Sequence, residues 1–137
     1  MADFRWHVGD PPPQIEEHSR AKLSVFRSYL SAYFDRLNVN PHREEFKLDL
    51  VDGFCGGGVF AAGLETVPGS PLIMLEEAHI AADRLNRSRS KHLRVDCKFY
   101  FVDKEQAHID HLKACLAERG YGPNDGAMVE IRVRGLR

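Results

Sequence analysis

The residues best suited to chemistry are an aspartate and four glycines in the stretch DGFCGGG, residues 52–58. They follow Phe46 to Val51, an apolar-rich run that predicts a largely buried strand. A glycine-rich turn after a strand places backbone N–H groups at the carboxyl edge of a sheet, and the missing Cβ atoms let a ligand approach the main chain. Because ligands of open α/β sheets bind at this edge, we expect a binding site here.

A second acid follows the next predicted strand. This strand spans about Val95 to Val102, and Asp103 comes directly after it. Asp103 and Gln106 have the spacing of a capping box, so we expect a helix to begin at Lys104. Asp103 could cap this helix, contact a ligand, or do both, and Asp52 could instead accept hydrogen bonds from its own loop.

Two kinds of nucleotide loop fit the glycines. Residues 56–61 satisfy GxGxxG/A, the dinucleotide fingerprint, which would make the chain a nicotinamide-binding fragment. That fingerprint expects an acid about 20 residues further on, at the end of the second strand, and Asp103 comes far later. Asp52 and Phe54 favour the other loop, of the form D-x-F-x-G-x-G.

This form resembles motif I of class I S-adenosylmethionine-dependent methyltransferases, and the version found in DNA cytosine methyltransferases. The resemblance implies that the glycine loop lines the methionine part of S-adenosylmethionine. It also implies that the acid after the second strand accepts hydrogen bonds from the ribose hydroxyls. The cofactor-binding residues predicted in this way are Asp52, Gly53, Phe54, Cys55, Gly56, Gly57, Gly58 and Asp103.

A narrower resemblance covers most of the chain. Lys22, Leu23, Tyr29 and Leu30 on a predicted helix, then the glycine loop, then "Gly-Ser-Pro-Leu" at 69–72 look like the three-Cys-motif partner protein family. Those bacterial proteins carry a methyltransferase-like domain, and they insert a segment between the glycine loop and the following helix. That insertion explains the long gap between the two acids. The chain departs from the family pattern at Cys55 and Gly57, where Ala and Pro are expected.

Helices and strands alternate along the rest of the chain. Apolar residues three and four apart predict a helix from about Gln14 to Leu37. Ser70 as N-cap and Pro71 at the first position predict the next helix, and Gly120 should end the one that begins at Lys104. A last strand is expected over 128–133. This order predicts an α/β fold with parallel strands joined by right-handed crossovers.

We therefore expect a Rossmann-like methyltransferase-type parallel sheet, truncated to about three strands, with an N-terminal amphipathic helix. Residues 1–13 form an N-terminal arm that includes three prolines, and 14–137 form the partial domain. The resemblance implies about seven strands in a complete sheet, and the acceptor-site motif would follow the fourth. Catalytic residues are therefore unknown, and catalysis by this chain alone is not expected.

The rival hypothesis is a non-catalytic protein-interaction module. An incomplete sheet leaves a strand edge and an apolar face open, so a protein partner or self-association through the sheet is expected in that case. Six basic residues near the end of the second main helix allow a nucleic-acid contact, or simply keep that segment soluble: Arg84, Arg87, Arg89, Lys91, His92 and Arg94.

Composition limits the remaining possibilities. The 137 residues carry 19 basic and 20 acidic side chains, a balance that does not predict a polyanion-binding surface. Three scattered cysteines argue against a disulfide framework, and no apolar run is long enough to span a membrane, so a cytoplasmic location is expected.

His108, His111 and Cys115 share a helix flank that we expect to be partly exposed, without a metal. His18 and Lys22 share a face of the first helix, at the surface or beside the site.

Overall fold

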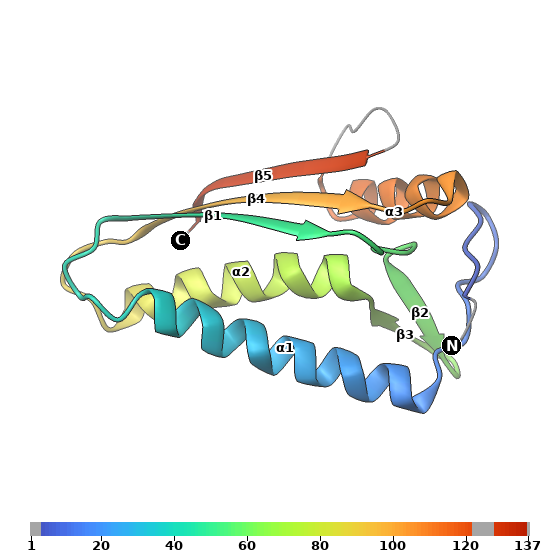
Figure 1. The fold of residues 1–137 in the computed structure, drawn as a ribbon, viewed down its shortest axis with the longest axis horizontal. Helices are drawn as coiled ribbons and strands as arrows, with labels where there is room; N and C mark the ends of the chain where they lie inside the picture. The colour runs from blue at the N-terminus through green and yellow to red at the C-terminus, as the bar shows by residue number, and fades with distance from the viewer. Residues whose placement is uncertain (1–3, 122–127, 137) are drawn as a thin grey trace.

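The computed structural model describes residues 4–121 and 128–136, which form an α/β fold of three helices and five strands (Figure 1). The helices are α1 (Glu17–Leu37), α2 (Ser70–Arg87) and α3 (Gln106–Glu118). The strands are β1 (Glu45–Asp52), β2 (Val59–Ala62), β3 (Glu65–Pro68), β4 (Arg94–Val102) and β5 (Met128–Leu136). The main strands β1 and β4 and all three helices lie where the sequence predicts them, to within a few residues.

The larger sheet has the strand order β1-β4-β5. Strands β1 and β4 are parallel, and their register sets Asp52 beside Phe101. Both strands therefore end at the same edge of the sheet, and α2 connects them. This part of the predicted parallel sheet is confirmed.

The prediction that the last strand is parallel is wrong, because β5 runs antiparallel to β4. The reason is the position of α3, which stays at the carboxyl ends of β1 and β4 (Figure 1). Its 13 residues span about 20 Å, whereas the nine residues of β4 span about 30 Å. The helix does not carry the chain back along the sheet, so β5 begins at the end where β4 stops. It also extends to Leu136, beyond the predicted Val133.

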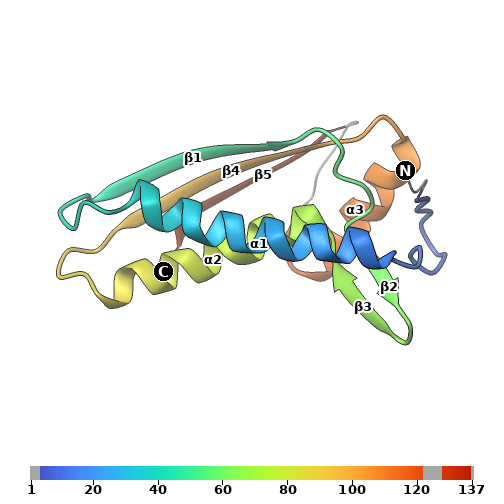
Figure 2. The ribbon, with the colours of Figure 1, turned by 60° about the horizontal axis from the view of Figure 1, so that its bottom comes forward.

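Helices α1 and α2 cover one face of this sheet (Figure 2). Phe99 and Phe101 of β4 are fully buried beneath α2 together with Leu72 and Leu75. Between α1 and α2, Arg27 donates hydrogen bonds to Glu76 and to the buried Glu77. Helix α1 therefore packs against α2.

A short hairpin that the sequence did not predict lies between the glycine loop and α2. Strands β2 and β3 pair antiparallel, and Gly63 opens their two-residue turn with φ +65°. Gln14 forms a bridge with Ala61, so the chain before α1 is extended. This pairing explains why α1 begins at Glu17 rather than at Gln14.

The predicted starts of the other two helices are also wrong in detail. Gly69, not Ser70, is the N-cap of α2, and the Ser70 hydroxyl bonds elsewhere. Helix α3 begins at Gln106 after the N-cap Glu105, without a side-chain capping bond. Its end is as predicted: Gly120 has φ +84°, a left-handed conformation that glycine adopts without strain.

Candidate functional site

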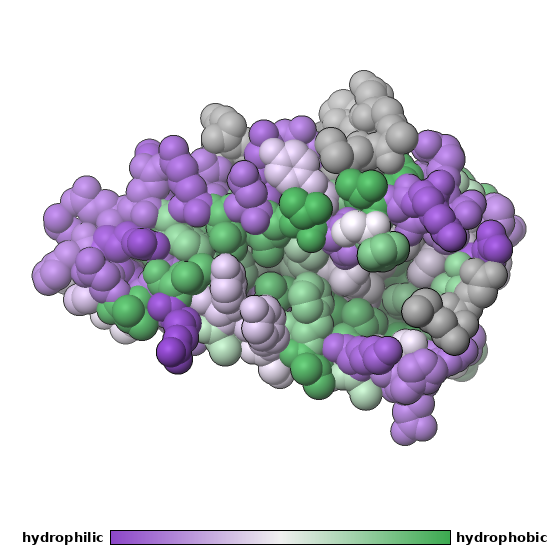
Figure 3. All heavy atoms as spheres, in the orientation of Figure 1, coloured by the Kyte–Doolittle hydropathy of each residue, from purple (hydrophilic) through white to green (hydrophobic). Residues whose placement is uncertain are grey.

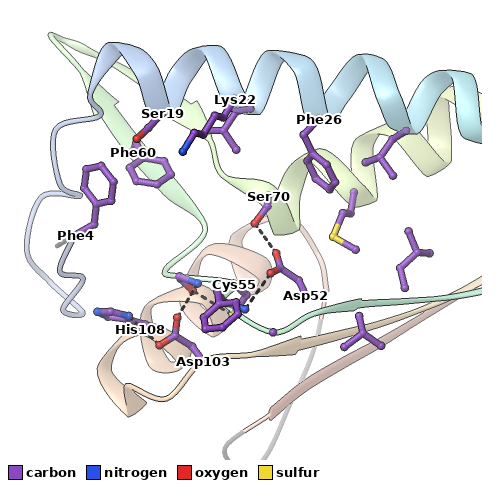
Figure 4. A pocket seen from close by; sticks show the side chains of 18 of the residues that line it. Phe4, Ser19, Lys22, Phe26, Asp52, Cys55, Phe60, Ser70, Asp103 and His108 are labelled. Atoms are coloured by element: carbon purple, nitrogen blue, oxygen red, sulfur yellow. Dashed lines mark hydrogen bonds and ion pairs between the residues drawn. The ribbon is translucent and has the colours of Figure 1, made fainter. Parts of the chain in front are cut away.

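A cleft of about 980 Å³ lies beside the carboxyl ends of β1 and β4 (Figure 4). Its walls come from α1, the end of β1, the glycine loop, the start of α2 and the N-terminal arm. Lys22 and Phe26 point from α1 toward the loop across this space (Figure 4). The cleft therefore joins the predicted loop to the predicted amphipathic helix.

Asp52 ties the glycine loop to the start of α2. Its Oδ1 accepts a hydrogen bond from the Phe54 backbone N–H at 3.2 Å, as expected of an acid that supports its own loop. Its Oδ2 accepts a hydrogen bond from the Ser70 hydroxyl at 2.5 Å. Ser70 thus holds Asp52 in position instead of capping α2, and both residues line the cleft.

Asp103 ties the same loop to β4 and α3. Its Oδ2 accepts a hydrogen bond from the Gly56 N–H at 3.0 Å, and its Oδ1 accepts one from the Glu105 N–H at 2.9 Å. His108 Nδ1 lies 3.1 Å from the same Oδ1. Asp103 therefore supports the first turn of α3, and its carboxylate also faces the cleft.

Trp6 of the N-terminal arm fills the space that the glycines leave open. Its side chain is only 5% exposed, and its Nε1 donates a hydrogen bond to the Val59 carbonyl at 2.7 Å. A Cβ atom on Gly56 would lie 2.9 Å from the indole, and one on Gly57 would overlap it. In this structure the group that approaches the glycine backbone is therefore the chain's own indole.

Aromatic and imidazole rings hold the arm in this position. The ring of Trp6 meets those of Phe60 and His108 edge-on, with centroids 5.1 and 4.9 Å away. Phe4 packs on Phe60 with centroids 5.0 Å apart. The arm therefore forms one wall of the cleft.

One flank of α3 packs against the glycine loop. His108, His111 and Cys115 are buried, so the prediction of a partly exposed flank is wrong. His111 Nδ1 lies 2.6 Å from the Gly57 carbonyl, and Cys115 Sγ lies 3.6 Å from the same oxygen. Within the described residues no group of three or more potential ligands could hold a metal ion.

Cys55 is a packed residue in this loop. It is buried, its N–H donates to the Val102 carbonyl, and burial followed by the charges of Asp52 and Asp103 raises the pKa of its thiol to about 12. The thiolate that a nucleophile requires is therefore disfavoured. Cys55 therefore acts as a small, packed residue in a tight turn.

Six of the eight predicted cofactor residues line the cleft. These are Asp52, Gly53, Phe54, Cys55, Gly56 and Asp103, and Phe54 is 91% exposed. Gly57 and Gly58 are buried behind the loop, against Trp6 and α3. Trp6 also lines the cleft, which the sequence did not predict. A lone tryptophan before a proline run was the only signal for it.

The loop lacks the geometry of the dinucleotide fingerprint. That fingerprint requires the glycines to open a helix whose N-terminus faces the pyrophosphate. Here Gly58 leads into β2, and the hairpin separates the loop from α2. The amides of Phe54, Cys55 and Gly56 are moreover bonded within the protein. This geometry disfavours the nicotinamide hypothesis.

Several side chains of the basic cluster bond within the chain. Arg84 pairs with Asp35, Lys91 with Glu44, and Arg94 with Glu45. Arg89 donates hydrogen bonds to the carbonyls of Asn38 and Asn40. These bonds hold the ends of α1, α2 and the strands together, and they reduce the charge available for phosphates.

The two polar residues predicted to share a face of α1 have different surroundings. Lys22 lines the cleft, whereas His18 is exposed and lies beside Glu16.

Comparison with protein-family models, curated proteins and solved structures found no match. None of the described helices is both long enough and apolar enough to cross a bilayer.

Proposed function

We propose that this cleft binds S-adenosylmethionine and that the chain is a Rossmann-like, methyltransferase-type domain. One observation carries the proposal. Two carboxylates line the same cleft: Asp52 ends β1, and Asp103 directly follows the adjacent parallel strand β4 and bonds to the glycine loop that begins after Asp52. In α/β sheets, ligands bind outside the carboxyl ends of the strands.

The chemistry of the cleft fits the charge of this cofactor. S-adenosylmethionine carries a sulfonium and an ammonium group, and both are stabilised by nearby carboxylates. A carboxylate has about four acceptor positions. The Asp103 carboxylate has three neighbours in the protein, namely the Gly56 and Glu105 amides and His108, which leaves room for one ribose hydroxyl.

The glycines differ in how closely a ligand can approach them. A Cβ atom on Gly53 would meet no atom within 4 Å, so this part of the loop is open. Gly56 and Gly57 lie beneath Trp6. We therefore infer that the methionine part first reaches the loop at Gly53 and Phe54, and that contact with Gly57 requires the arm to move.

A catalytic role is not assigned. Methyl transfer needs an acceptor held in line with the methyl group, and none of the cleft residues can be given that task.

The motifs on which the family resemblance depends, DGFCGGG and Gly69 to Leu72, contribute Asp52 and Ser70 to the cleft. The three free cysteines suit the reducing cytoplasm that we propose as the location.

The proposal is tested by isothermal titration calorimetry of the purified chain with S-adenosylmethionine and, separately, with NAD. We expect saturable heat with S-adenosylmethionine alone. Asp103→Asn keeps the size of the side chain but removes its charge, and it should weaken binding about 10- to 100-fold. Asp83→Asn makes the same change on the exposed side of α2, outside the cleft, and should leave binding unchanged.

Asp103 also supports the loop, so thermal melting must show that Asp103→Asn is folded. Loss of binding by a folded variant supports the proposal. Heat with NAD alone, or no heat with either compound, would contradict it.

A further inference from the structure

The outer edge of β1 is unpaired among the described residues, since β1 is the first strand in the order β1-β4-β5. It forms the upper margin of the sheet in Figure 2. The Arg94 N–H bonds to the Glu44 carbonyl, so alternate residues from Glu44 onward turn their backbone polar groups toward β4. The residues between them turn theirs to the open edge: Glu45, Lys47, Asp49 and Val51.

The cleft continues as an apolar groove directly beneath this edge, between β1 and α1 (Figure 3). Leu48 and Leu50 form its wall on the β1 side. Tyr29 and Tyr33 form its wall on α1, stacked with centroids 5.8 Å apart and 62% and 37% exposed. An open strand edge beside exposed apolar residues marks an association surface.

We propose that a second copy of this chain covers this surface. The two β1 strands pair antiparallel, with Leu48 of each copy at the two-fold axis. This register sets Lys47 opposite Asp49 of the second copy, and Asp49 opposite its Lys47. On the helix-covered face it sets Phe46 opposite Leu50.

Of the registers with the two-fold axis at Lys47, Leu48 or Asp49, only the one at Leu48 sets opposite charges across from each other. A two-fold axis at Lys47 would oppose Lys47 with its own copy and Glu45 with Asp49. An axis at Asp49 would oppose two copies of Asp49. Like charges directly opposite destabilise a strand pair, whereas opposite charges stabilise it. A shift by one residue would pair the apolar face with the charged face.

The backbone also fits this register. Lys47 and Asp49 both turn their N–H and C=O groups outward, so they form hydrogen-bonded pairs with the second copy. Leu48 and Phe46 then fall in the non-hydrogen-bonded pairs, where side chains lie closer together. The result is an isologous interface that continues the sheet across both copies. The strand pairing itself uses no cofactor, so it is tested on the chain without S-adenosylmethionine.

Charge reversal on the edge tests the register. We expect sedimentation velocity to show a dimer of the unmodified chain. Lys47→Asp and Asp49→Lys each place like charges opposite each other at two symmetric points, and each should raise the dimer dissociation constant about 30-fold. The double variant Lys47→Asp/Asp49→Lys restores opposite charges and should dimerise like the unmodified chain.

Mixing the two single variants provides the sharpest control. Lys47→Asp in one copy opposes Asp49→Lys in the other, so the mixture should form a heterodimer at concentrations where each variant alone is mostly monomeric. Equal effects of Arg87→Asp, an exposed position at the end of α2 and outside the cleft, would point to a general charge effect and contradict the register. A monomer at every concentration of the unmodified chain, or a dimer that ignores these substitutions, would overturn the proposal.

Discussion

Replacing Gly57 by alanine should release the N-terminal arm from the glycine loop. A Cβ atom at Gly57 would overlap the indole of Trp6, whereas one at Gly53 would meet nothing within 4 Å. Neither glycine has a positive φ, so alanine brings no backbone strain at either position. The same substitution is thus expected to destabilise the fold at Gly57 and to have almost no effect at Gly53.

The size of the effect follows from the contacts of Trp6. Removing a buried tryptophan side chain from its packing costs about 3–5 kcal/mol. Release of Trp6 itself regains conformational entropy worth about 1–2 kcal/mol, which offsets part of this cost. We expect Gly57→Ala to lower the free energy of unfolding by about 2 kcal/mol and the Tm by about 5–10 °C. Gly53→Ala should change the free energy by less than about 0.5 kcal/mol.

Fluorescence reads this outcome directly, because Trp6 is the only tryptophan in the chain. In Gly57→Ala the emission should shift to the red as the indole enters water, while the far-ultraviolet circular dichroism stays unchanged. Gly53→Ala should keep the emission of the unmodified chain. If Gly57→Ala leaves both the emission and the Tm unchanged, the indole does not pack on this glycine and our explanation of the loop is wrong.

Three further predictions concern the residues that hold the cleft in shape. Ser70→Ala removes the hydroxyl that bonds to Asp52 and should lower the free energy of unfolding by about 1–2 kcal/mol in urea denaturation. Arg27→Ala leaves the buried Glu77 without its partner and should lower the free energy of unfolding by about 2 kcal/mol. Because salt screens a buried charge only weakly, the loss should be equal at high salt. The raised pKa of Cys55 favours its neutral form in the folded chain, so the stability it contributes is present below about pH 9 and is lost as the pH rises toward 12. The Tm should therefore fall above pH 9, and a Cys55→Ser variant that falls equally steeply would contradict this assignment.

The strands and the loop could be predicted because their signals are local. The alternation of Phe46, Leu48 and Leu50 with charged residues predicts a strand, and Gly53 and Gly56 predict a turn at its carboxyl end. The prediction that this strand is largely buried is wrong, because β1 is buried on one face only and Val51 is 69% exposed. Asp52 and Asp103 follow two such strands, so their presence at one edge needed only the parallel pairing of β1 and β4. That pairing follows from the intervening helix.

The missed features depend on contacts distant in sequence. The direction of β5 is set by where α3 packs, and α3 is fixed by buried contacts of His111 and Cys115 with the Gly57 carbonyl. Polar residues on a helix flank normally predict exposure. The position of Trp6 depends on the empty space above Gly57, which no residue near Trp6 in the sequence reveals.

The β2–β3 hairpin was missed for a different reason. Its strands have four residues each, and two of those in β2 are alanines, which have low strand propensity. Its turn contains Gly63 but no Asn or Asp, the residues that give the strongest hairpin signal.

The most direct test of the proposed function is the emission of Trp6 during titration with S-adenosylmethionine. The cofactor should alter the emission saturably, because it must contact or displace the indole to approach Gly56. The same dissociation constant should be obtained by calorimetry, and NAD should have no effect. An emission that does not change with S-adenosylmethionine, together with the absence of heat, would contradict the assignment of this cleft as a cofactor site.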